Sequence, residues 1–122
     1  AYLAAADRAL KLIGTTSPSY ILLGGLEAAV TAAAGAGARY AELYEAITRL
    51  KKAFVFAAND DFTRLVLDGA AYGTGGAALY RALLEHGAAA EKFDERYVVF
   101  IVTHFDAADD IRRLGKILKE VL

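Results

Sequence analysis

The stretch DERYVVFIVTHFDAADDIRRLGKILKEVL, residues 94–122, contains in one run both kinds of element that decide the fold. Residues 97–102, YVVFIV, are β-branched and aromatic without interruption, which is typical of a buried strand. Asp94 and Glu95, directly before this run, indicate a turn. The sequence therefore predicts a strand that enters from a turn and is followed by a polar segment.

The end of the same stretch has the spacing of an amphipathic helix. Asp106 is expected to cap this helix, with Asp109 three residues later in the position of a capping box. Apolar residues then recur at three- and four-residue steps, at Ile111, Leu114, Leu118 and Val121. A strand followed by a helix with one apolar face predicts that the two pack together.

Working upstream from this stretch, short elements alternate in type. The expected order is a possible strand at 53–58, a strand at 63–68, a helix that opens at Thr74-Gly75-Gly76 and a short strand at 88–92. Gly87 is a suitable residue for the end of the helix. Together with 94–122, this order predicts an α+β domain over residues 54–122, in which two helices cover one face of a small, mostly antiparallel sheet.

Residues 1–53 are expected to form a helical segment. Helical spacing is clear at 2–13, and a second helix is expected from Pro18 to the glycines at 35 and 37. Residues 39–53 form the clearest amphipathic helix, with Glu45 and Arg49 as an exposed pair four residues apart. From its pattern alone, the helix at 39–53 would belong to an independent helical hairpin.

The composition excludes several classes of function. The 122 residues have a formal net charge of -1, which gives no indication of a nucleic-acid partner. The chain has no cysteine, which excludes disulfides and cysteine-based zinc sites. It also has no methionine, so we expect a piece of a longer chain or an engineered one. Apolar residues make up 57%, more than one small domain needs, which points to a missing partner surface.

Residues 20–38 have the length of a membrane span and carry one charge, Glu27. The segment is nevertheless rich in alanine and glycine, which contribute little transfer energy, and Glu27 near its centre would be costly in lipid. We therefore expect no membrane role for this segment.

The run Thr-Thr-Ser-Pro-Ser-Tyr, residues 15–20, is the strongest candidate for a binding site. Pro18 suits the first turn of a helix, which would place Ser17 at the N-cap. Thr15, Thr16 and Ser17 would then surround the positive end of that helix, where hydroxyls and free N–H groups can hold an anion, phosphate above all. A well-capped helix start without a ligand is the plainer interpretation.

Several runs resemble the ornithine/lysine/arginine decarboxylases. They are LKLIGTTSPSYILLGGLEAA (10–29), NDDFTRLVLD (59–68), YGTGGAALYRALLEHG (72–87) and DERYVVFIVTHFDAADDIRRLGKIL (94–118). The resemblance covers most of the chain and is weakest at 32–58. These enzymes have the aspartate-aminotransferase fold (fold type I) and use pyridoxal phosphate. The family usually has a tyrosine after the Thr-Gly step at 74–75, where this chain has Gly76.

The resemblance implies that this chain is the C-terminal portion of a cytoplasmic decarboxylase. Thr15, Thr16 and Ser17 would contact the phosphate of a cofactor bound in the neighbouring subunit, and residues 63–122 would form one wall of the active-site cleft. The implied partners are the large domain of the same enzyme and a homodimer mate. Which of the three basic amino acids is the substrate does not follow from these residues.

The lysine that binds the cofactor in this family is not recognisable here. It follows a Ser-x-His pair upstream of the Thr-Thr-Ser-Pro run, whereas the only histidines of this chain are His86 and His104 and neither precedes a lysine. Lys11 lies near the run, within an amphipathic pattern. We therefore assign no catalytic residue and expect the isolated chain to be inactive, with no covalently bound cofactor.

The remaining motifs are weaker. The glycines at 69, 73, 75 and 76 follow a strand and open a helix, but their spacing matches no phosphate-binding loop, so they are interpreted as structural. His104 with Asp106 and Asp109 is the best cluster for a metal or acid–base site, yet both aspartates are better explained as helix caps, and no metal site is expected.

Two further hypotheses stay open. A stand-alone or engineered α+β interaction module without catalysis would suit the alanine-rich composition and the lack of Met, Cys and Trp. Another fold-type-I enzyme, such as an aminotransferase, would need an arginine for the substrate carboxylate, and no arginine of the chain lies in a recognisable motif.

Overall fold

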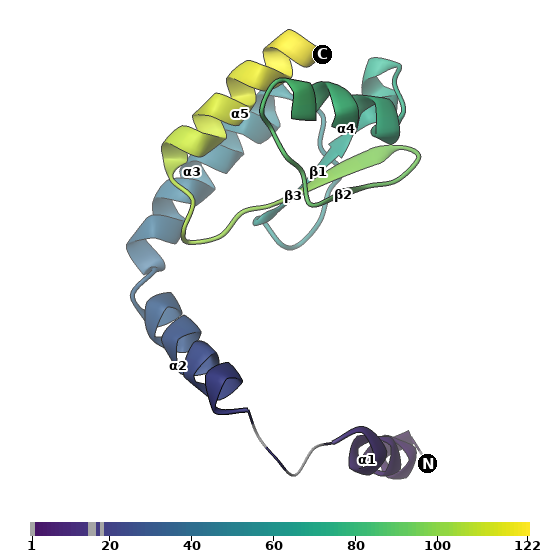
Figure 1. Ribbon diagram of the computed structural model, residues 1–122. Helices are drawn as coiled ribbons and strands as arrows, with labels where there is room; N and C mark the ends of the chain where they lie inside the picture. Colours follow the sequence, from purple (N-terminus) through teal and green to yellow (C-terminus); the bar gives the residue numbers. More distant parts are fainter. Residues whose placement is uncertain (1, 15–16, 18) are drawn as a thin grey trace. The chain divides into compact units, whose positions relative to one another are not determined.

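The computed structural model describes residues 2–14, 17 and 19–122 (Figure 1). By its contacts the chain divides into two compact units, Ala1–Gly35 and Ala36–Leu122. The sequence had grouped residues 1–53 together, whereas the helix that follows Ala36 packs within the second unit. The reason is that this helix carries its own row of buried side chains, at Leu43, Ala46, Ile47 and Leu50.

The first unit contains α1 (Tyr2–Ile13) and α2 (Tyr20–Ala34). The predicted helix at 2–13 is confirmed, and Lys11 pairs with Asp7 one turn away, with 2.8 Å between Nζ and Oδ2. α2 is apolar around most of its circumference, and none of its residues is buried. A helix that is apolar on most sides is usually covered by other protein. Because the side chains described in this unit are exposed, they form no core of their own.

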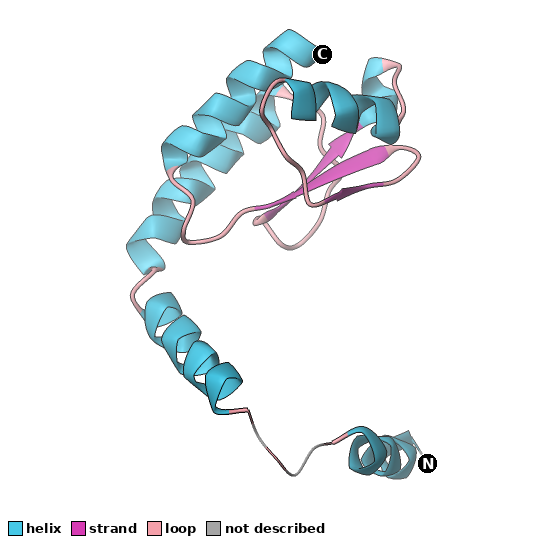
Figure 2. Cartoon of the chain, viewed as in Figure 1, coloured by secondary structure: helices cyan, strands magenta, loops and turns pink. Residues whose placement is uncertain are grey.

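The second unit is α+β, as predicted (Figure 2). Its elements are α3 (Gly37–Ala53), β1 (Arg64–Asp68), the 3₁₀ turn η1 (Gly69–Tyr72), α4 (Gly76–Glu85), β2 (Lys92–Phe93), β3 (Tyr97–Ile101) and α5 (Ala108–Val121). The strands form an antiparallel sheet in the order β1-β3-β2. β3 is central because its β-branched and aromatic run can be paired on both edges.

The core lies between one face of this sheet and the three helices. Leu65 and Leu67 of β1 and Val98 and Phe100 of β3 alternate with outward-facing neighbours, so all four point to the same face. The helices cover that face with the following buried residues: Leu43, Ile47 and Leu50 of α3, Leu79 and Leu83 of α4, and Ile111, Ile117 and Leu118 of α5. One continuous hydrophobic cluster therefore holds the whole unit together.

The possible strand at 53–58 is wrong as a strand. α3 continues through Ala53, and Phe56 makes only an isolated bridge to Leu67. Two further backbone bonds tie the segment to β1: Ala57 N–H donates to the Val66 carbonyl at 2.8 Å, and Asp68 N–H donates to the Val55 carbonyl at 3.1 Å. The short segment thereby covers the outer edge of β1, which would otherwise present unpaired groups.

The cap of α5 also differs from the prediction. The helix begins after Ala107, whose N–H donates to the Asp110 carboxylate at 2.8 Å. Asp106 instead accepts from the backbone N–H of Thr103 at 2.6 Å and from its hydroxyl at 3.0 Å. The chain therefore makes one more tight turn before the helix starts, which moves the capping role by one residue.

Within the described residues, no single helix is long and apolar enough to cross a membrane. α2 and α3 reach the required length and composition only when they are taken as a pair.

Candidate functional site

The predicted anion site lies at the start of α2. Thr15, Thr16 and Pro18 lie outside the described residues, whereas Ser17 is described, is exposed and precedes the helix. The N-cap is Ser19 and not Ser17: its hydroxyl accepts from the backbone N–H of Leu22 at 3.4 Å. The prediction placed the helix start two residues too early, because Ser19 offers the same capping oxygen one step before the apolar run.

The charge at the first turn of α2 is favourable for binding an anion. It contains no acidic residue, and its side chains are exposed, Tyr20 by 84%. The helix dipole places partial positive charge at this end. The Ser19 hydroxyl accepts from the N–H of Leu22, and the Ser19 carbonyl accepts from the N–H of Leu23. An exposed helix start without acidic residues is compatible with a phosphate.

The glycine-rich loop between β1 and α4 is explained by close backbone packing. Gly73 has a φ of 70°, which favours glycine. A Cβ on Gly69 would lie 2.9 Å from the Arg96 carbonyl oxygen, and one on Gly76 would lie 2.7 Å from that of Tyr97. Both glycines therefore let the loop approach the turn between β2 and β3, and this packing accounts for them without a ligand.

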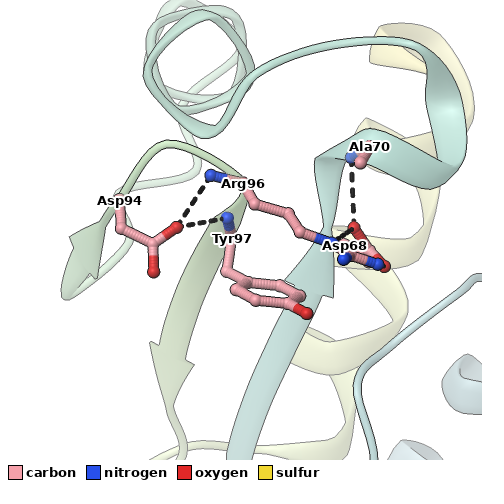
Figure 3. Close-up of polar contacts among 5 residues, drawn as sticks. All are labelled: Asp68, Ala70, Asp94, Arg96 and Tyr97. Atoms are coloured by element: carbon pink, nitrogen blue, oxygen red, sulfur yellow. Dashed lines mark hydrogen bonds and ion pairs between the residues drawn. The ribbon is translucent and has the colours of Figure 1, made fainter.

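That turn is held by an ion pair that joins distant parts of the chain (Figure 3). Arg96 binds Asp68 through two bonds, from Nε to Oδ1 at 2.9 Å and from Nη2 to Oδ2 at 2.6 Å. Asp68 also accepts from the N–H of Ala70 at 3.1 Å. The hydrogen bond from Arg96 lowers the pKa of Asp68, and the same bond raises the pKa of Arg96. Because both carboxylate oxygens already accept hydrogen bonds within the fold, we interpret the pair as structural.

Asp94 completes this turn. Its Oδ1 accepts from the backbone N–H of Tyr97 at 2.7 Å and from that of Arg96 at 2.8 Å, and these bonds lower the pKa of Asp94 (Figure 3). The guanidinium of Arg96 lies over the Tyr97 ring, 5.0 Å from its centroid. Arg96 is therefore held on two sides, and the turn predicted from Asp94 and Glu95 is confirmed.

The two histidines do not come together. His86 ends α4, with Nδ1 2.8 Å from the Ala82 carbonyl oxygen. The His104 ring lies against Phe105 at 4.1 Å and near Tyr40 at 6.1 Å, between ring centroids. Its Nε2 is buried without a hydrogen-bond partner in the described part of the chain.

The aspartates near His104 are used elsewhere. Asp106 binds Thr103, and Asp109 accepts from Nε of Arg112 at 2.8 Å. Over residues 2–14, 17 and 19–122, no group of three His, Cys, Asp or Glu side chains is arranged to hold a metal ion.

A feature that the sequence analysis missed is an open groove of about 370 Å³ between α3 and α5. The two helices run side by side (Figure 1), and a Cβ on Gly115 would lie only 3.1 Å from Leu50 Cδ1. Four cations stand around the groove: Arg49, Arg112, Lys116 and Lys119. We call this feature the basic groove. The spacing of the α5 cations at i, i+4 and i+7 would have predicted that they share one face of a helix. Only the packing shows that this face lies beside α3.

Comparison with models of protein families, with curated proteins and with solved structures found no match for this chain.

Proposed function

We propose that this chain is the C-terminal portion of a cytoplasmic, pyridoxal-phosphate-dependent decarboxylase of lysine, ornithine or arginine. The observation that carries the proposal is the run of hydroxyl residues at 15–17 and 19, which precedes α2 in the sequence, together with the exposed first turn of α2, which has no acidic residue. The sequence resemblance through this run and through 59–118 supports the same assignment. The α+β arrangement of the second unit is compatible with it.

In this proposal the chain binds the cofactor phosphate and leaves the chemistry to the other part of the enzyme. Thr15, Thr16 and Ser17 would donate hydrogen bonds to the phosphate, and the dipole of α2 would add to the attraction. Pyridoxal phosphate, when bound, supplies the electron-withdrawing ring that decarboxylation at the α-carbon requires. None of the six lysines of this chain lies in the Ser-x-His-Lys context of the family.

The apolar surface of α2 supports a missing partner. Its large side chains are exposed, for example Leu26 by 62% and Ile21 by 87%. Solvent exposure of so many apolar groups on one helix is unfavourable, since each fully buried side chain of this kind contributes about 1.5–3 kcal/mol. The large domain and the homodimer mate are the partners that would cover this helix.

A stand-alone or engineered interaction module is the second proposal. It is favoured by one observation: the second unit already has a continuous core that includes residues of all three of its α-helices. Such a unit needs no further domain for its stability.

The deciding experiment starts with the coding sequence upstream of Ala1. We expect it to encode a Ser-x-His-Lys motif, and the resulting full protein to release CO₂ from one of the three amino acids when pyridoxal phosphate is added. Substitution of Thr15, Thr16 and Ser17 by alanine should raise the cofactor concentration at half-maximal activity by about ten-fold or more. Thr31→Ala is the matched control, because it removes a hydroxyl from the same helix near its far end.

Two results would contradict the decarboxylase. One is a start codon directly before Ala1. The other is a full protein that releases no CO₂ from any of the three amino acids when pyridoxal phosphate is added. Either result would favour the interaction module. An active protein whose cofactor requirement is the same for the triple variant and for Thr31→Ala would instead contradict the phosphate contact by Thr15, Thr16 and Ser17.

A further inference from the structure

The basic groove has an apolar floor. Leu50 and Phe54 of the α3 segment and Ile111 of α5 line it, together with the small residues Ala53 and Gly115. Small residues between two packed helices leave a furrow into which the side-chain ridge of a third helix fits. The groove therefore has the shape of a site for a helix.

The charged residues that line the groove are all cations. Arg112, Lys116 and Lys119 follow one another along α5, and Arg49 stands opposite them on α3. All four side chains are exposed, and no carboxylate of a described residue lines the groove. The chain as a whole has a net charge of -1, so this concentration of positive charge is local.

The cations are only partly neutralised within the chain. Arg49 lies 3.7 Å from Glu45, and Arg112 binds Asp109, whereas none of the ion pairs found within residues 2–14, 17 and 19–122 includes Lys116 or Lys119. Lys116 and Lys119 are therefore the cations of the groove that are available to pair with carboxylates of a ligand.

From this combination we propose that the basic groove binds an amphipathic acidic helix of a partner protein. The partner's apolar ridge would lie on Leu50, Ala53 and Gly115, and carboxylates on its two flanks would pair with the cations of α3 and α5. From Arg112 to Lys119 the groove is about 10 Å long, which corresponds to two turns of helix. This inference does not depend on the decarboxylase proposal.

The position of the cations favours a helix over a flat anionic surface. A membrane would contact the outermost parts of α3 and α5 and would leave the furrow between them empty. Cations on both sides of an apolar furrow match an elongated ligand with carboxylates on both of its flanks.

The test uses the full chain and a fluorescent amphipathic peptide of about three helical turns, with leucines on one face and glutamates on both flanks. We expect saturable binding by anisotropy. K116E/K119E should weaken it about ten-fold or more, and Ala53→Trp should weaken it by filling the furrow. The matched control is R81E/K92E, which changes the net charge equally on exposed residues away from the groove. Circular dichroism verifies that each variant is folded.

Three results would overturn the proposal. The first is equal loss of binding in K116E/K119E and R81E/K92E with no effect of Ala53→Trp, which would mean unspecific attraction. The second is self-association of the chain that K116E/K119E abolishes, which would assign the groove to a second copy. The third is binding to phosphatidylserine vesicles but not to the peptide, which would assign it to a membrane surface.

Discussion

Arg96 and Asp68 are 28 residues apart in the chain and form a two-bond ion pair that ties the β2–β3 turn to the end of β1. Asp68 is only 7% exposed, so its carboxylate has little access to water. A buried carboxylate that loses its partner is unfavourable. The Arg96–Asp68 pair therefore fixes the position of the turn that packs against the glycines of the η1–α4 loop.

We expect Asp68→Asn to lower the melting temperature of the chain by about 4–8 °C. The amide keeps the volume but removes the charge that Arg96 binds and places an N–H₂ group where an acceptor is needed. Thermal unfolding followed by circular dichroism is the measurement. Asp60→Asn, on an exposed residue near the surface turn at 59–61, serves as the control, and an equal shift in both variants would show that the pair is not important.

Stability should fall in acid. Asp61, Asp68 and Asp94 have a pKa below the ordinary value of 3.8, because each accepts hydrogen bonds, Asp68 chiefly from Arg96.

The sign follows from the direction of these pKa shifts. A carboxyl whose pKa is lower in the folded state than in the unfolded chain stabilises the fold above the unfolded value, and it loses this contribution as the pH falls from about 4 toward the folded pKa. Urea unfolding at several pH values between neutrality and about pH 2 measures this loss. Asp68→Asn should make the profile less steep, and an unchanged slope would contradict the assignment.

The two units should differ in their response to the loss of a leucine. Leu118→Ala removes a side chain that is 0% exposed at the centre of the core and should lower the free energy of unfolding by about 2–5 kcal/mol. Leu26→Ala, on the exposed surface of α2, should change it by less than about 0.5 kcal/mol. Urea unfolding of both variants checks this, and a large effect of Leu26→Ala would mean that α2 is buried in solution.

Gly76→Ala should destabilise the second unit by about 1–3 kcal/mol. The added methyl group would meet the backbone carbonyl oxygens of Asp94 and Tyr97, which cannot move without opening the turn. Gly37→Ala is the matched control, because a Cβ there has no atom within 4 Å. Chemical denaturation distinguishes the two, and equal stability of both variants would show that the loop tolerates a side chain.

Local pattern was sufficient to predict most of the second unit. The continuous apolar run at 97–102 predicted β3, and the spacing of Ile111, Leu114 and Leu118 predicted α5, because a strand and a helix repeat their side-chain directions at different periods. Gly87 was predicted as the residue after a helix, and its φ of 80° agrees with that role. These features depend on neighbours only a few residues away.

Caps were predicted less well, since several polar residues in a row can each offer an oxygen. The helical backbone of α2 starts so that Ser19, and not Ser17, is the cap. In α5 the capping carboxylate is likewise that of Asp110. The segment 55–57 pairs with β1 because the other edge of β1 is already occupied by β3. This pairing, and with it the end of α3 at Ala53, could not be predicted from the local sequence.

The amino-acid sequence by itself determined the α+β class, the order of β1, α4, β3 and α5, and the hydroxyl-rich run before α2, because each depends on residues that are close together in the chain. Only the tertiary structure decided that Arg96 meets Asp68 and that the cations of α3 and α5 surround one apolar furrow. The first relationship depends on the register of β1 against β3, and the second depends on the packing of α3 against α5. Both are set by side chains throughout the core, so no short stretch of sequence predicts them.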